Sequence, residues 1–448
     1  MKAINNILVI YLFLLINVKS STTISFSSSG DGYTVSGNVV TITSNGEYDI
    51  KGIQNNKQII ASSSCTINLY SFTLTNSGTL TPILVRAEQT LKLVLIGEST
   101  LQDSSTNEND GTIYLSKGAS LIISGTGTLN INPYKLMAIN GTDGTSLTVN
   151  DGPSINIKST SSNVGGIYMR KEINFNNAKY TYSCTSGSKH AIDTEGTVKL
   201  VKGTFTINSG NGKGIQSETY LYIGEENGSD SDLTLTITTR NEGIEAKKIE
   251  IYSGRISITT GEGGINAASS GDDCDETVQC SGNCACYLRI KGGLLTVNSR
   301  EDGLNSNGDI IISGGKTIIF APANDYDQPI GQDGLLSITG GAVLATGSSA
   351  MGRITAQTNQ TEKTYTGSIS SGAKLEASDS RGNEIFSLTT PKAANYLYLN
   401  YGSDFRVTSN GNEIISLGSN KSDQEKRCYT KRFKALNILF MIGLIMVF

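Results

Sequence analysis

The chemistry that this sequence most directly suggests is the binding of a divalent cation. Five aspartates and one asparagine gather between residues 302 and 333, at Asp302, Asn305, Asp309, Asp325, Asp327 and Asp333. Ca²⁺ takes roughly six to eight oxygen ligands in irregular geometry, and a cation relieves the repulsion between neighbouring carboxylates. We therefore expect calcium there, with positions left open for the carboxylate of an acidic sugar. The alternative is that these residues are solvated turn formers.

Aromatic side chains are the second kind of group that would bind a sugar, because they offer an apolar ring with a polar tip. Trp is absent, so Tyr and Phe are the only large aromatic residues. The candidates are Tyr168, Tyr220, Tyr222, Tyr252 and Tyr326. For each of them, packing in the wall of the fold is the alternative interpretation.

Acid–base catalysis has few candidates in this chain. The only histidine, His190, lies in the segment SKHAID, where we expect a turn or corner. A calcium-dependent polyuronate lyase is the main enzymatic alternative, since it needs a cation beside the sugar carboxylate and a Lys or Arg base. Lys247, Lys291 and Arg300 are available for that role, and nothing in the sequence selects one. The sequence thus favours binding over catalysis and assigns no catalytic residue.

These side chains must be positioned by strands. Short runs such as LTLTITT (233–239) and KIEIYSG (248–254) alternate apolar and polar residues, which is the period of a strand. A longer repeat lies above this alternation, because an apolar residue after a small or polar pair recurs every 21 to 30 residues, with one interval of 39 that contains a Cys-rich insert. The repeated residues are Ile83, Ile113, Ile139, Ile167, Ile192, Ile215, Ile244, Ile265, Leu304 and Ile330.

Such a repeat predicts a solenoid in which each coil contacts only its neighbours. A coil of this length fits three strands and three bends, and stacking places each repeated Ile over the next one. The residues after them, Asp193, Gln216, Glu245, Asn266 and Asn305, then form an outward ladder. Glycines such as Gly315 and Gly341 would form left-handed corners. We predict an all-β protein with a parallel β-helix; a β-sandwich or a propeller is the rival architecture.

The ends of a stack of coils must be covered. We expect N-terminal cap strands at 21–58, the β-helix at 59–345, and a C-terminal antiparallel strand group at 346–414. The turns Asp379–Gly382 and Asn410–Gly411 predict hairpins in that group.

The two termini have the composition of processing signals. Residues 1–20 combine Lys2 with an apolar stretch and predict a secretory signal peptide. A polar spacer at 415–434 precedes a hydrophobic tail at 435–448, a pattern typical of a GPI-attachment signal; a short membrane helix is the alternative. We expect a secreted monomer at the cell surface, in contact with the membrane only through a lipid anchor or this tail.

Secretion would permit disulfides and glycans. Cys274, Cys280, Cys284 and Cys286 lie close together in the insert and predict two disulfides rather than a zinc site. The sequons at Asn140, Asn227 and Asn359 are candidate glycosylation sites, and a further one lies at Asn420. The formal net charge of −4 argues against a nucleic-acid partner.

Several segments in order resemble one known family. GEYDIKGIQNNKQIIA, EGIEAKKIEIYSG, GGINAASS, EDGLNSNGDIIISGG and LLSITGGAVLATGSS are similar to the carbohydrate-binding domain-containing proteins, over about residues 46–412. The resemblance implies a right-handed parallel β-helix with bound calcium that binds an acidic, pectin-like polysaccharide. The sequence departs from the family pattern where Gly263 replaces an Asp and where Gly331-Gln332-Asp333 replaces an Asp-Tyr-Asp run.

These observations together predict a polysaccharide-binding protein, with calcium assisting. Two alternatives stay open: a polysaccharide lyase on the same fold, and a structural surface-coat or adhesion protein without a sugar site.

Overall fold

The computed structural model describes residues 21–104, 111–134, 136–184, 186–268, 285–350 and 353–418. Every element in these ranges is a β-strand, and none is a helix, as the alternation of apolar and polar residues predicts. The chain divides into two compact units, residues 1–221 and 222–448. Both are parallel β-solenoids, with about 12 turns between them, so the predicted fold class is confirmed.

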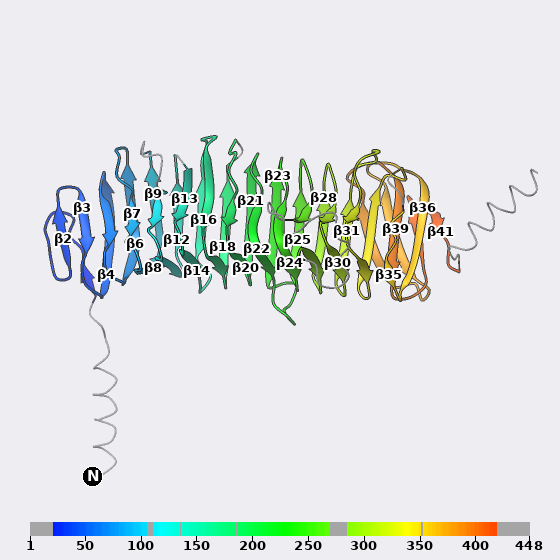
Figure 1. Cartoon of the computed structure of the whole chain (residues 1–448), viewed down its shortest axis with the longest axis horizontal. Coiled ribbons are helices and arrows are strands. Elements are labelled where there is room, and N and C mark those ends of the chain that lie inside the picture. The colour runs from blue at the N-terminus through cyan, green and yellow to red at the C-terminus, as the bar shows by residue number, and fades with distance from the viewer. Residues whose placement is uncertain are drawn as a thin grey trace, which may run out of the picture. The chain divides into compact units, whose positions relative to one another are not determined.

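In the first unit each coil contributes one strand to each of three parallel faces, and Figure 1 draws these strands as successive rungs from blue to green. The first face contains β3 (Val39–Ile42), β5 (Gln58–Ala61), β7 (Ile83–Val85), β10 (Ile113–Leu115), β13 (Leu136–Gly141), β16 (Val164–Met169), β19 (Ile192–Thr194) and β22 (Ile215–Ile223). The second contains β1 (Thr22–Thr23), β4 (Glu47–Asn55), β6 (Cys65–Asn76), β8 (Thr90–Ile96), β11 (Ser120–Gly125), β14 (Ser146–Val149), β17 (Glu172–Phe175) and β20 (Thr197–Leu200). The third contains the second half of β6, then β9 (Glu98–Asp103), β12 (Thr128–Asn132), β15 (Ser154–Lys158), β18 (Ala178–Ser183) and β21 (Gly203–Gly210).

The second unit, taken by itself, is also built of three faces. The first face contains β24 (Ile244–Ile251), β26 (Ile265–Ala267), β29 (Leu304–Ser306) and β32 (Ile330–Gln332). The second half of β24 belongs to the second face, because it pairs with β27 (Tyr287–Ile290) while the first half pairs with β26. The other strands of the second face are β30 (Asp309–Ile312), β33 (Leu336–Ile338) and β35 (Gln357–Thr358). The third contains β23 (Leu233–Thr239), β25 (Arg255–Thr259), β28 (Leu294–Asn298), β31 (Lys316–Phe320) and β34 (Ala342–Gly347).

The repeated apolar residues form the predicted columns. In the first unit Ile167 pairs with Ile139 on one side and with Ile192 on the other. In the second unit Ile265 pairs with Ile244 and Leu304. These six side chains are fully buried, so the columns are the dry interior of each solenoid. Each buried Ile contributes about 1.5–3 kcal/mol of hydrophobic stabilisation.

Left-handed glycines form corners at which successive coils approach each other closely. Gly315 and Gly341 have φ of 75° and 78°. A Cβ at Gly341 would lie 2.5 Å from the carbonyl oxygen of Gly315, and one at Gly315 would lie 2.5 Å from that of Gly293. Only glycine therefore fits these corners, both for its φ and for the space.

At the N-terminus, β2 (Tyr33–Ser36) pairs antiparallel with β3 as a hairpin. Parallel pairing already starts in this region, because β1 pairs with β4 and β3 pairs with β5. The parallel ladder therefore begins before residue 59.

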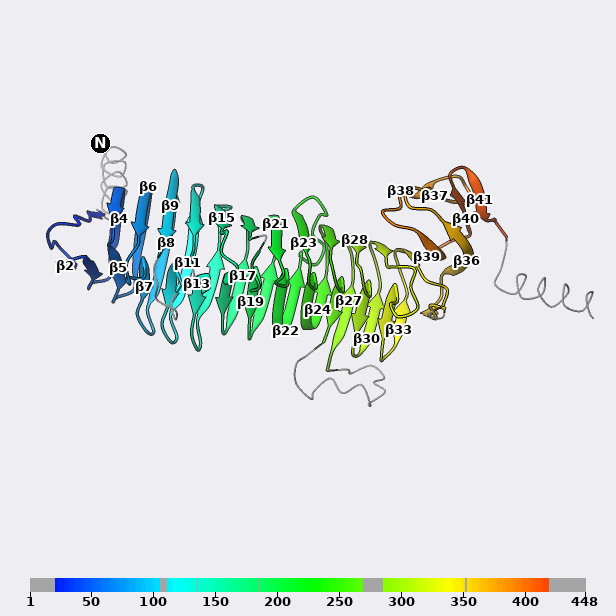
Figure 2. The ribbon, with the colours of Figure 1, turned by 90° about the horizontal axis from the view of Figure 1, so that it is seen from above.

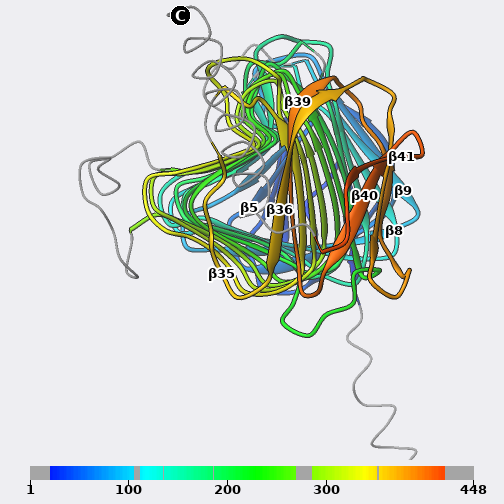
Figure 3. The same cartoon turned by 90° about the vertical axis from the view of Figure 1, so that its right-hand side faces the viewer.

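The C-terminal strands are antiparallel, as predicted. β36 (Thr361–Ile369) and β39 (Ala394–Tyr401) lie side by side in Figure 3, and β39 also pairs with β34. A separate sheet contains β37 (Lys374–Asp379), β38 (Glu384–Thr389), β40 (Phe405–Ser409) and β41 (Asn412–Ile415), drawn in orange in Figure 2. The predicted turns at Gly382 and Asn410–Gly411 connect its strands, and all three residues have positive φ.

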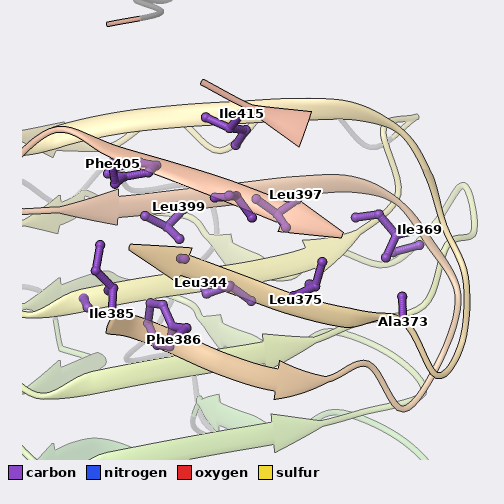
Figure 4. Packing of buried hydrophobic residues seen from close by; sticks show 14 residues of the cluster. Leu344, Ile369, Ala373, Leu375, Ile385, Phe386, Leu397, Leu399, Phe405 and Ile415 are labelled. Carbon is purple, nitrogen blue, oxygen red and sulfur yellow. The ribbon is translucent and has the colours of Figure 1, made fainter. Parts of the chain in front are cut away.

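A hydrophobic cluster joins the strands of this C-terminal group. Figure 4 shows Leu397 and Leu399 of β39 packing with residues of the orange sheet, such as Leu375 and Phe405. All four side chains are fully buried. The C-terminal strands thus form a hydrophobic core of their own, and through β39 they cover the last strand of the second solenoid, β34.

The predicted leader and C-terminal tail lie outside the described residues. Within the described ranges, no helix has the length and apolar character that crossing a membrane requires.

Candidate functional site

A concentrated group of aromatic and charged side chains lies on the second face of the second unit. β24 and β27 run in parallel register, with Lys248 opposite Tyr287 and Glu250 opposite Arg289. The alternate residues Ile249 and Leu288 are buried, so the polar residues between them point outward. Lys248, Glu250, Tyr252, Tyr287, Arg289 and Lys291 together are called the Tyr–Lys–Arg face below.

Glu250 is the centre of this face. Its Oε2 accepts hydrogen bonds from Lys291 Nζ at 2.8 Å and from the Tyr252 hydroxyl at 2.5 Å. Its Oε1 accepts from the Tyr287 hydroxyl at 3.0 Å and from an Arg289 guanidinium nitrogen at 3.4 Å. Burial alone would raise the pKa of Glu250, but the hydrogen bonds from Lys291, Tyr252 and Tyr287 outweigh it and lower the pKa to about 2. The carboxylate is therefore charged at any physiological pH.

The cations of this face lie against its aromatic rings. The Arg289 guanidinium is 3.9 Å from the centroid of the Tyr287 ring, and Lys291 Nζ is 4.4 Å from that of Tyr252. Lys248 Nζ lies 5.8 Å from the Tyr287 ring centroid. Such cation–π contacts each contribute roughly 0.5–1 kcal/mol at exposed sites, so they hold the long side chains in one geometry.

The face can bind an anion but is poorly suited to remove a proton. Arg289 and Lys291 both contact the single carboxylate of Glu250, so these three groups together carry a positive charge on a chain whose net charge is −4. Arg289 and Lys291 keep 36% and 37% of their side chains exposed, so both reach solvent. Burial opposes the charge on Lys291, but its hydrogen bonds to Glu250 and Tyr252 raise its pKa, and it stays protonated. A protonated lysine cannot act as a general base.

The outward polar ladder of the first face is present as predicted. Asn305 Nδ2 donates to Asn266 Oδ1 at 3.4 Å, and Asn266 Nδ2 donates to Glu242 Oε1 at 3.1 Å. The next position along this ladder is Gly331, which pairs with Asn305. Because the Asn305 amide nitrogen points to Asn266, its oxygen faces the space over Gly331.

That space brings two of the predicted calcium ligands together. A Cβ at Gly331 would lie 3.2 Å from Asn305 Oδ1 and 3.5 Å from Asp302 Oδ2. The other oxygen of Asp302 accepts the backbone N–H of Gln328 at 2.5 Å. Burial raises the pKa of Asp302, and the nearby Asp327 raises it further, while the Gln328 hydrogen bond acts in the opposite direction. The absent side chain at position 331 thus leaves a small cradle with two oxygens.

The other predicted ligands are placed differently. Asp309 is buried and accepts the backbone N–H of Leu335 at 2.8 Å, which fixes a corner of the coil. Asp327 forms hydrogen bonds with Asn324, while Asp325 and Asp333 are exposed. Among the described residues, no three His, Cys, Asp or Glu side chains gather closely enough to hold a metal ion.

The remaining candidates are scattered over both units. The Tyr168 hydroxyl donates to Glu195 at 2.7 Å in the first unit, and Tyr326 is 84% exposed in the second. Nδ1 of His190 accepts the backbone N–H of Lys213 at 3.0 Å, which fits the corner position expected for it. The two other bases considered for a lyase, Lys247 and Arg300, do not belong to the Tyr–Lys–Arg face.

The cysteine and glycan predictions are only partly within the described residues. Cys286 is buried, whereas Cys274, Cys280 and Cys284 lie outside the described residues, so their pairing stays a prediction. Cys65 and Cys184 are buried free thiols. The candidate glycosylation sites Asn227 and Asn359 are exposed, and Asn140 is half-buried on β13.

Sequence reasoning missed Glu250, Tyr287 and Arg289. Their signal was present, because KIEIY (248–252) and YLRIK (287–291) align through their buried apolar residues. The insert between the two segments hides that alignment, since it lengthens one coil and not its neighbours.

One comparison with known proteins identifies a family for the chain. The model of one family, described as carbohydrate-binding domain-containing protein, matches residues 36–325, which is more than half of the chain. No curated protein matches the chain, and no solved structure matches it either. By its sequence, its solenoid fold and this match, the chain belongs to the family of carbohydrate-binding domain-containing proteins.

Proposed function

We propose that this carbohydrate-binding protein binds an acidic, pectin-like polysaccharide through the Tyr–Lys–Arg face. The observation that carries the proposal is the network around Glu250, which holds Lys291 and Arg289 beside two tyrosine rings. An acidic chain gains affinity for a polyanion only where cations are concentrated, and this face places Arg289 and Lys291 side by side, both partly exposed.

The residues of the face would act in different ways on a uronic acid unit. Arg289 offers a planar fork of donors that matches a carboxylate, and Lys291 offers a point charge. The rings of Tyr252 and Tyr287 offer apolar surface for the carbon-bound hydrogens of the sugar. Glu250 fixes all four side chains before the sugar arrives, so less conformational entropy is lost on binding.

Calcium is the second part of the proposal. Asp302 and Asn305 would hold the ion in the cradle over Gly331. Two protein oxygens are fewer than the roughly six that Ca²⁺ takes, so water and a sugar carboxylate would complete its shell. The ion would supply a positive charge for that carboxylate, and we expect calcium and acidic sugar to bind together.

The direct test is to compare polygalacturonate with its fully methyl-esterified form on the purified protein. The esters keep the polymer chain but remove its charge. We expect the protein to retain polygalacturonate and to retain the ester much more weakly, because the ester has no carboxylate for Arg289 and Lys291 to bind. Equal retention of both polymers would contradict an acidic-sugar site.

The two alternatives predict different outcomes. A lyase would generate unsaturated sugars that absorb in the ultraviolet, and the protonated state of Lys291 argues against that activity. A structural coat protein would retain no glycan on an array, with or without a chelator.

We also propose that the protein is secreted and attached to the cell surface by a lipid. The support is the composition of residues 1–20 and 415–448. Release of the protein from intact cells by a phosphatidylinositol-specific phospholipase would support the GPI anchor, and its retention would favour a membrane helix.

A further inference from the structure

A cleft of about 220 Å³ opens in the first unit at the carboxyl ends of three consecutive strands of the third face. Gln102, Asn132 and Lys158 lie at or next to the last positions of β9, β12 and β15, and Asn132 pairs with Gln102 in the parallel register. Tyr134 follows β12 and lines the cleft with 52% of its surface exposed. Neighbouring strands are about 4.8 Å apart, so these residues form a short polar row.

Hydrogen bonds between coils fix the walls of this cleft. Ser159 Oγ donates to the carbonyl oxygen of Pro133 at 3.0 Å, and the backbone N–H of Ser161 donates to Ser159 Oγ at 3.1 Å. The buried thiol of Cys184 donates to the carbonyl oxygen of Ser161 at 3.3 Å. Hydrogen bonds therefore hold the segment 159–161 to the coil before it and to the coil after it. The cleft is formed before any ligand enters.

The chemistry of the lining differs from that of the Tyr–Lys–Arg face. Lys158 and Asp103 carry opposite charges, so they give the cleft no net charge. Gln102 and Asn132 add amide donors and acceptors, and the Tyr134 ring adds an exposed apolar surface. Paired hydroxyls of a sugar can both donate and accept hydrogen bonds, and they match such a mixed lining better than a carboxylate does.

We propose that this cleft binds one residue of a neutral polysaccharide, with the sugar ring lying on Tyr134. The volume is below the roughly 300–1,000 Å³ of pockets for drug-sized ligands, which fits a single sugar ring. The site lies within the first unit and uses no residue of the Tyr–Lys–Arg face. The two sites would let one chain contact the charged and uncharged parts of a mixed wall polysaccharide.

The test measures the affinity of the full chain for cellohexaose, xylohexaose, mannohexaose and galactohexaose, and for polygalacturonate. Tyr134→Ala removes the ring, and Tyr134→Phe keeps it. Tyr70→Ala is the matched control, because Tyr70 is 38% exposed on β6 of the same unit and does not line the cleft. Circular dichroism checks that each variant is folded.

We expect at least one neutral hexaose to bind the unaltered chain and to bind Tyr134→Ala roughly tenfold more weakly. Tyr134→Phe and Tyr70→Ala should bind the neutral hexaose as tightly as the unaltered chain does. All three variants should keep the affinity for polygalacturonate. The proposal is overturned if no neutral hexaose binds, or if Tyr134→Ala binds it as the unaltered chain does. If the unaltered chain binds a neutral hexaose but not polygalacturonate, the Tyr–Lys–Arg face is contradicted and this cleft is not. If Tyr134→Ala loses polygalacturonate binding, the cleft binds the acidic polymer and this proposal is overturned.

Discussion

Glu250 and Lys291 come from neighbouring coils of the second solenoid, and their side chains meet with Lys291 Nζ at 2.8 Å from Glu250 Oε2. The chain between them contains β25, β26 and β27 as well as the Cys-rich insert, so only the stacking of coils brings the two residues together. The same contact lowers the pKa of Glu250 and raises that of Lys291. The buried carboxylate of Glu250 thereby holds the partly exposed cations Arg289 and Lys291 in place.

The first prediction concerns the stability that this contact provides. Because the pKa of Glu250 falls from 4.5 to about 2 on folding, its charge stabilises the protein above about pH 4.5, and that contribution disappears as the pH falls towards 2. Glu250→Gln should lower the free energy of unfolding by about 1–2 kcal/mol at pH 7, allowing for solvent screening. Urea unfolding at pH 7 and pH 3 measures this difference.

The control for this experiment is Glu384→Gln, at an exposed position of β38. It should leave the free energy of unfolding unchanged at both pH values. An unfolding free energy of Glu250→Gln equal to that of the unaltered protein at pH 7 would show that the network contributes no stability.

The second prediction concerns Asp193, whose charge lowers the stability of the folded protein instead of raising it. Burial, together with the nearby Glu218, raises the pKa of Asp193 from 3.8 to about 6. The folded state therefore disfavours the charged carboxylate, and this part of the stability is present below about pH 4 and lost as the pH rises through 6. Asp193→Asn should raise the free energy of unfolding by about 2 kcal/mol at pH 7.5 and by little at pH 4.

Asp31→Asn is the matched control for Asp193, because Asp31 is an exposed aspartate of the same unit. Its unfolding free energy should follow that of the unaltered chain at every pH. If Asp193→Asn is destabilising at pH 7.5, the carboxylate has an attractive partner and the account of its burial is wrong.

The third prediction concerns calcium. Calcium together with trigalacturonate should raise the melting temperature by a few degrees, because a ligand that binds only the folded state stabilises it. Asp302→Asn should abolish this shift, while Asp333→Asn should keep it, since Asp333 is exposed and does not border the Gly331 cradle. An equal shift in both variants, or no shift in the unaltered protein, would remove Asp302 and Asn305 as calcium ligands.

Much of the fold could be predicted from the sequence, because one apolar residue in each coil fixes the register. Once Ile265 is placed over Ile244, Asn266 must lie beside Glu245, and the ladder follows from chain geometry. The glycine corners follow in the same way, since a Cβ at Gly341 would meet the backbone of the previous coil.

The site was harder to predict, for two physical reasons. The insert before β27 breaks the coil length, so the pairing of Glu250 with Arg289 cannot be read from a constant spacing. Proximity in sequence also misled the prediction for the aspartates. Asp302 precedes the short strand β29 in the sequence and Asp309 follows it. Asp309 is buried in a corner of the coil, where it accepts the backbone N–H of Leu335.

The measurement that tests the central claim most directly is the affinity for a polygalacturonate oligomer by calorimetry, at low and high salt. Arg289→Ala combined with Lys291→Ala should weaken binding at least about tenfold at low salt, and added salt should weaken binding of the unaltered chain. Arg255→Ala, an exposed arginine on the third face of the same unit, is the control and should bind normally. If the double variant binds as tightly as the unaltered chain at low salt, the Tyr–Lys–Arg face is not the polysaccharide site.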